Sequence, residues 1–151
     1  MATVRANTII ERAMSITGSY LMGGGGPRLW DCSGFVGYCV TGTYSHPFAT
    51  GGEGAYLRSL GFTDMRGSVN FITGDGMKKG DILIWNKEGT AGTGADGHTE
   101  IYWGYGTTLG ASGGQGRPVG LARGPRSVSY TPWQECWRPR GGVALIRWVN
   151  S

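Results

Sequence analysis

The first third of the chain has apolar residues at helical spacing. Between Thr3 and Thr17 they predict one buried helix face, with Thr3 or Asn7 as the cap and Gly18 after the end: Ile9, Ile10, Ala13, Met14 and Ile16. A second stripe predicts a helix that starts at Cys32: Phe35, Val36, Cys39 and Val40. A third, short helix is predicted from Glu53 to Leu60, where Gly61 ends it.

The second half of the chain changes from helical spacing to short runs rich in aliphatic and aromatic residues. Such runs predict strands at 81–85, 99–103, 107–111 and 143–149. Helices that come first and strands that follow favour an α+β domain, in which N-terminal helices pack on a small antiparallel sheet.

Length and composition fit one domain, residues 1–151, with many loops. Hydrophobic residues make up 39% of the chain, enough for a core, and its thirty glycines far exceed the usual share of about 7%. The glycines fall in clusters rather than at a fixed period, so loops between short strands explain them better than a repeat does.

The charge of the chain leaves the partner open. A formal net charge of +4 suits an anionic partner such as nucleic acid or teichoic-acid-bearing cell wall, but the basic residues are scattered, with only a modest concentration from Arg117 to Arg140. A plain solvated basic face explains them equally well.

The chemistry of the cysteines and histidines excludes several classes of site. Three cysteines in a chain without a signal sequence argue against a disulfide framework. Without CxxC or HExxH spacing, a metal site has no positive support. No apolar run approaches the roughly 20 residues of a membrane span, and the first residues lack a signal-peptide pattern. We therefore expect no transmembrane segment, and synthesis in the cytoplasm.

The strongest local motif is Asp31-Cys32-Ser33-Gly34-Phe35-Val36, which puts a cysteine at a loop-to-helix junction. Unpaired backbone N–H groups and the positive end of the helix dipole favour the thiolate there and can hold an oxyanion. The alternative is a cysteine that simply packs as a small core residue.

A second motif supplies a base. In Gly97-His98-Thr99-Glu100-Ile101-Tyr102 a histidine opens a strand that follows the buried run Gly80-Asp81-Ile82-Leu83-Ile84-Trp85. From such a rigid position an imidazole can reach a nucleophile on the helix. The other histidine, His46, lies in a Ser-His-Pro loop and is better explained as a polar surface residue.

Taken together, these motifs resemble the NlpC superfamily of papain-like cell-wall cysteine hydrolases, which includes phage amidases and endopeptidases. The resemblance runs from about Tyr20 to Ser112 and includes Tyr20 with Gly23 and Gly24, the Cys32 motif, the Gly80-Asp81 strand, and Gly97-His98 followed by a Gly104-Tyr105-Gly106 turn. It implies a papain-like NlpC-type domain that needs no cofactor, with Cys32 as nucleophile and His98 as general base. By the same resemblance Tyr20 lies near the cysteine, and Asp31 and Ser33 line the substrate pocket. We add Trp30 to the substrate-binding residues, because it lies near the entrance to the site.

The chain departs from the family pattern at the third catalytic residue, which normally orients the imidazole. Counting along the next strand puts that residue at Gly110, which has no side chain for the task. Glu100 shares a strand face with His98 by alternation. We expect the orienting group to be Glu100, with Ser112 and a backbone carbonyl left as alternatives.

The resemblance implies a peptidoglycan hydrolase that cleaves a stem-peptide amide bond, as an endopeptidase or as an N-acetylmuramoyl-L-alanine amidase. We expect a phage-encoded lysin that acts on the cell wall as a monomer, with phage tail or lysis proteins as further partners and without nucleic acid. The alternatives are a non-catalytic wall-binding or phage tail domain, an injected interbacterial amidase toxin, and a cysteine acyltransferase or deamidase.

Overall fold

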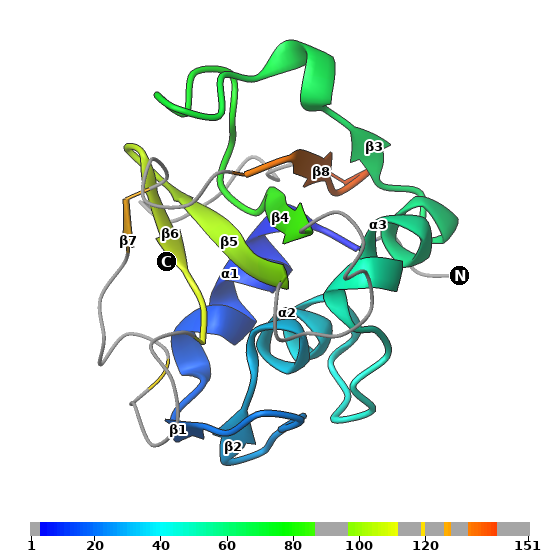
Figure 1. Ribbon diagram of the computed structural model, residues 1–151, viewed down its shortest axis with the longest axis vertical. Helices are drawn as coiled ribbons and strands as arrows, with labels where there is room; N and C mark the ends of the chain where they lie inside the picture. Colours follow the sequence, from blue (N-terminus) through cyan, green and yellow to red (C-terminus); the bar gives the residue numbers. More distant parts are fainter. Residues whose placement is uncertain (1–3, 87–96, 112–118, 120–125, 128–132, 142–151) are drawn as a thin grey trace, which may run out of the picture.

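The computed structural model describes residues 4–86, 97–111, 119, 126–127 and 133–141. Within these ranges the chain first forms helices α1 (Ala6–Ser15), α2 (Cys32–Thr41) and α3 (Thr50–Ser59). A parallel pair of two-residue strands, β1 (Ser19–Tyr20) and β2 (Leu29–Trp30), lies between α1 and α2. This pair lies beside the helices, away from the main sheet (Figure 1).

The main sheet is antiparallel and follows in the chain. Its strands lie in the order β3-β8-β4-β5-β6-β7. Their bounds are β3 (Thr63–Asp64), β4 (Ile82–Asn86), β5 (Gly97–Gly104), β6 (Thr107–Leu109), β7 (Arg126–Ser127) and β8 (Glu135–Arg138), and a 3₁₀ turn, η1 (Arg66–Ser68), follows β3. Helices α2 and α3 pack on β5, and α3 also contacts β4 and β8. The α+β class, with helices on a small antiparallel sheet, is therefore confirmed.

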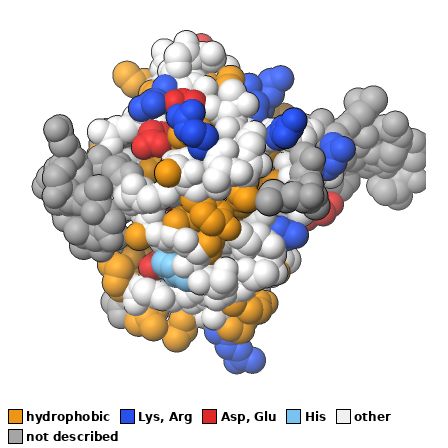
Figure 2. Space-filling view, turned by 90° about the vertical axis from the view of Figure 1, so that its right-hand side faces the viewer, with side chains coloured by type: hydrophobic (Ala, Val, Ile, Leu, Met, Phe, Trp, Pro, Cys, Tyr) orange, Lys and Arg blue, Asp and Glu red, His pale blue; other side chains and the backbone are white. Residues whose placement is uncertain are grey.

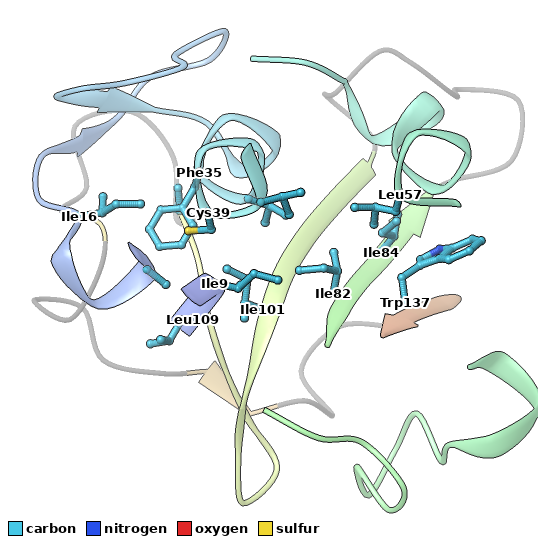
Figure 3. Close-up of a cluster of buried hydrophobic side chains, with 14 of the residues drawn as sticks. Ile9, Ile16, Phe35, Cys39, Leu57, Ile82, Ile84, Ile101, Leu109 and Trp137 are labelled. Atoms are coloured by element: carbon cyan, nitrogen blue, oxygen red, sulfur yellow. The ribbon is translucent and has the colours of Figure 1, made fainter. Parts of the chain in front are cut away.

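Two hydrophobic clusters hold the layers together. The larger one joins α1, α2 and α3 to the sheet through side chains such as Ile9, Phe35, Leu57, Ile82 and Ile101 (Figure 3). The smaller one contains Met77, Leu83, Tyr102, Trp133 and Cys136. Neighbouring residues of β4 and β5 belong to different clusters, as the period of two in a strand requires. Both central strands are thus covered on both faces.

The start of α2 depends on a close approach that only glycine allows. Asp31 caps the helix by accepting a hydrogen bond from the Gly34 N–H at 2.7 Å. A Cβ on Gly34 would overlap the carbonyl oxygen of Gly24, which itself accepts the Asp31 N–H at 2.9 Å. The glycine-rich loop therefore lies directly against the first turn of the helix.

The predicted elements are largely present, with two notable differences. The helix start at Cys32 is confirmed, and α1 and α3 overlap the predicted helices. The Asn7 cap is wrong, because the cap position is Arg5 and no side chain caps the helix there. The sequence did not predict β8, which pairs with β4 near the middle of the sheet. Thr3 and the strand predicted at 143–149 lie outside the described residues.

A buried ion pair ties β8 to the start of β4. Asp81 is fully buried and accepts two hydrogen bonds from Arg138, Nε to Oδ1 at 2.9 Å and Nη2 to Oδ2 at 2.8 Å. Its Oδ2 also accepts the Lys78 N–H at 2.9 Å. The aspartate of the Gly80-Asp81 motif thus links β8 to the start of β4 and has the partners that a buried carboxylate needs.

The surface charges are dispersed. On the face drawn in Figure 2, Lys and Arg side chains stand apart from one another, and some of them lie against acidic side chains. Among the described residues, Arg66 pairs with Asp64 at 2.7 Å. None of the described helices has the length and apolar character that a membrane span requires.

Candidate active site

Cys32 is the first residue of α2, and its thiol is buried between the helix start and β5. Its side chain is 5% exposed. Burial raises the pKa of its thiol to about 12 and outweighs the backbone N–H groups of Thr99 and Ser33, which face the sulfur and lower that pKa. The helix start therefore acts on the sulfur as expected, while burial favours the neutral thiol.

The Asp31 carboxylate contacts several groups in and around the loop that precedes the cysteine. Besides the Gly34 N–H, its Oδ1 contacts His46 Nε2 at 2.9 Å and the Ser33 hydroxyl at 3.3 Å, and its Oδ2 accepts the Gly23 N–H at 3.0 Å. His46 is therefore more than a polar surface residue, because its imidazole supports the helix cap. Asp31 and Ser33 are both buried, so their polar atoms serve the loop first.

His98 is held by neighbours on two sides. Its Nε2 lies 2.7 Å from Glu100 Oε2, and its ring stacks on Trp133 with centroids 5.9 Å apart. The other oxygen of Glu100 accepts a short hydrogen bond from the Thr108 hydroxyl on β6. Glu100 is 1% exposed, so these contacts fix the carboxylate and, through it, the imidazole.

Gly110 provides the space that Glu100 occupies. A Cβ at Gly110 would lie 2.8 Å from Cγ of Glu100, well inside van der Waals contact. The position where the family pattern would carry a side chain is thus filled from the neighbouring strand. Of the alternatives for the orienting group, Ser112 lies outside the described residues.

The tryptophans divide between core and site. Trp30 is 1% exposed and donates its Nε1–H to the Thr17 carbonyl at 2.9 Å, so it is a core residue, and contact with a substrate does not fit its burial. Trp137 is also buried and joins the larger cluster. Trp133 stacks on His98.

Tyr20 lies close enough to Cys32 to interact with it electrostatically. Burial is the main cause that raises the pKa of its hydroxyl, and the negative charge of Asp31 adds to it. Tyr20 is half-buried on β1, and the short strand thereby brings a phenol to the cysteine.

Sequence reasoning missed a buried acid beside the cysteine. Glu53 of α3 is fully buried, and its Oε2 lies 2.7 Å from the Thr99 hydroxyl. The sequence offers one clue to this burial. Glu53 lies four residues before Leu57 and therefore shares a helix face with a residue that is buried.

The described residues offer no metal site with three or more histidine, cysteine, aspartate or glutamate ligands. Cys32, Cys39 and Cys136 are buried free thiols. The arrangement can therefore supply a thiol, an imidazole and a carboxylate, the groups needed for acyl transfer through a cysteine.

Comparison with known proteins gave one family and several solved structures. A family model described as the NlpC/P60 family matches residues 17–137. Among solved structures, NlpC2 and NlpC1 from Trichomonas vaginalis each match 89% of this chain at 18% identity, with a TM-score of 0.48. The chain spans 45% and 42% of those two chains, less than half of either. No curated protein matches the chain.

Proposed function

The chain belongs to the NlpC/P60 family, and on that premise we propose that it is a cysteine hydrolase that cleaves an amide bond in the peptide part of bacterial peptidoglycan. The family is generally one of cysteine peptidases that act on this polymer. The observation that carries the proposal is how three consecutive residues of β5 lie relative to Cys32 and to one another. The Thr99 N–H faces the sulfur of Cys32, and the residues on either side, His98 and Glu100, are joined at 2.7 Å.

In the proposed first step, Cys32 attacks the amide carbonyl carbon while its proton passes to His98. Because burial raises the pKa of Cys32 to about 12, the proton leaves as the sulfur–carbon bond forms rather than beforehand. Because Nε2 lies 2.7 Å from Glu100 Oε2, we assign the uptake of this proton to Nδ1. Glu100 then stabilises the imidazolium, the role of the orienting acid in a triad.

The oxyanion of the tetrahedral intermediate is assigned to the N–H of Cys32 itself. At the start of α2 the N–H groups of Gly34 and Phe35 already bond Asp31, and that of Ser33 faces the sulfur. The helix dipole favours negative charge at the same place.

The second half of the reaction restores the enzyme. The intermediate collapses, the carbon–nitrogen bond breaks, and His98 gives its proton to the leaving amine. Water then attacks the thioester, with His98 as base, and the Cys32 thiol and a carboxylate product are released.

Mass spectrometry of purified peptidoglycan after incubation with the protein tests the proposal. The wild type should release stem-peptide fragments or free stem peptides, and Cys32→Ala and His98→Ala should release none. Cys39→Ala is the matched control, because Cys39 lies on the same helix but in the core, and it should retain activity. Products that form equally with Cys32→Ala would overturn the proposal, and no products from the wild type would favour a binding role or another amide substrate.

The scissile bond and the biological setting belong to the same proposal. The run Gly80-Asp81-Ile82-Leu83-Ile84-Trp85 resembles phage amidases and endopeptidases, and it supports a phage lysin. A new free amine on L-alanine in the products would identify an amidase, and a cut within the stem would identify an endopeptidase. A fall in turbidity of a cell-wall suspension would support the lytic role.

A further inference from the structure

Glu53 is a buried acid with an unusual set of contacts. Both carboxyl oxygens lie in the interior, where Oε2 is 2.7 Å from Thr99 Oγ1 and Oε1 has no hydrogen-bond partner among the described residues. A carboxylate left with one bare buried oxygen would be costly, whereas a neutral acid leaves only a carbonyl unpaired.

The two hydrogen-bond contacts of the Thr99 hydroxyl indicate that Glu53 carries a proton. Its hydroxyl lies 2.7 Å from Glu53 Oε2 and 2.8 Å from the Leu83 carbonyl oxygen. A hydroxyl carries one hydrogen, and the Leu83 oxygen can only accept. Both contacts are satisfied if Thr99 donates to Leu83 and accepts from a protonated Glu53.

The ionisable groups around Glu53 favour the same state. From the start of α2 it faces Cys32 and Asp31, and from β8 it faces Glu135. Burial is the largest cause that raises the pKa of Glu53 well above the ordinary glutamate range; Glu135 and Asp31 add to it, and the contact with Thr99 opposes it. A charged Glu53 would also oppose negative charge on the Cys32 sulfur.

We propose that Glu53 is a positioning residue, held as the neutral carboxylic acid, whose proton bonds Thr99 and fixes the segment from His98 to Glu100 against Cys32. This inference rests on the proposed function, because the segment matters only if those residues act together. The Thr99 N–H faces the sulfur, and so a hydrogen bond from α3 to the Thr99 side chain sets the distance between strand and nucleophile.

Three variants test the inference. Glu53→Gln keeps the size and a donor for Thr99, so kcat and the rate of Cys32 alkylation by iodoacetamide should stay within about threefold of wild type. Glu53→Met keeps the length without a donor, so kcat should fall by about tenfold or more at a similar KM. Glu135→Gln is the matched control, because it removes a nearby acid without touching Thr99, and it should retain kcat.

Two results would overturn the inference. If Glu53→Gln raised the rate of Cys32 alkylation about tenfold at a given pH, Glu53 would be charged in the wild type. If folded Glu53→Met kept the wild-type kcat, positioning would be refuted.

Infrared spectroscopy of the wild type tests the proton without relying on any variant that might not fold or on hydrolysis. At pH 7 the spectrum should contain the carbonyl band of a protonated carboxylic acid, and the absence of that band would refute the neutral state. If the wild type released no peptidoglycan products but the band and the alkylation pattern were as expected, the proposed function would fail while the neutral Glu53 stood.

Discussion

Replacing Gly110 with alanine should disable the site by displacing Glu100. The new Cβ would lie 2.8 Å from Glu100 Cγ, 3.4 Å from its Cβ and 3.5 Å from its Cδ. An ordinary carbon–carbon contact is about 3.5 Å, so the side chain must retreat by about 0.7 Å. Glu100 is 1% exposed and bonded at both oxygens, so the shift falls on its hydrogen bonds. A 2.7 Å contact to His98 lengthened by that amount is no longer a good hydrogen bond.

The expected loss is in the chemical step. A misplacement approaching 1 Å at an orienting group lowers kcat by about 10- to 100-fold, with KM nearly unchanged. The assay is the rate of product release from peptidoglycan, with folding checked by circular dichroism. Gly52→Ala is the matched control, because Gly52 lies in helix α3 and a Cβ added there would have no neighbouring atom within 4 Å. It should keep kcat and raise the free energy of unfolding by up to about 1 kcal/mol.

A double-mutant cycle sharpens the test. If Gly110→Ala acts only through Glu100, the variant with both Gly110→Ala and Glu100→Ala should be no slower than Glu100→Ala alone. A folded Gly110→Ala protein with the wild-type kcat would refute the reasoning. The orienting group would then be sought in Ser112 or a backbone carbonyl.

Three further predictions follow from buried groups. Because the pKa of Glu53 is raised on folding, its contribution to stability is complete below the ordinary glutamate range and falls as pH rises toward the folded pKa. We therefore expect the free energy of unfolding of Glu53→Gln, measured in urea, to rise relative to that of the wild type by about 1.4 kcal/mol for each pH unit above that range. If both proteins showed the same dependence on pH, the prediction would be contradicted. Since burial raises the pKa of Cys32 to about 12, its alkylation rate should climb about tenfold per unit between pH 7 and 9. A plateau near neutrality would instead reveal a preformed ion pair. Arg138→Leu leaves the buried Asp81 carboxylate without its cation and should lower the free energy of unfolding by about 3 kcal/mol. A loss under about 1 kcal/mol in urea denaturation would count against the ion pair.

The parts of the fold that the sequence could predict are those with a local cause. Cys32 begins a helix because a glycine-rich loop precedes an apolar stripe, and both are visible in adjacent residues. The strands β4 and β5 are likewise marked by consecutive aliphatic and aromatic residues.

The parts that escaped prediction depend on residues far apart in the chain. Strand β8 has only four residues, and both Cys136 and Trp137 in it are buried, so no alternation marks it. Glu53 looks like an ordinary polar helix residue, and its hydrogen-bond partner Thr99 lies 46 residues later in the chain. The match between Gly110 and Glu100 exists only once β5 and β6 are paired.

The covering of β5 on both faces has a consequence for how the protein loses activity. Amide hydrogens between two packed layers exchange only when the whole sheet opens, whereas loops and lids open at lower free energy. The described part of the proposed catalytic strand is therefore among the last segments to become accessible. On heating, the loss of hydrolysis should coincide with the unfolding of the sheet. The activity that remains at each temperature then reports the fraction of molecules that are still folded.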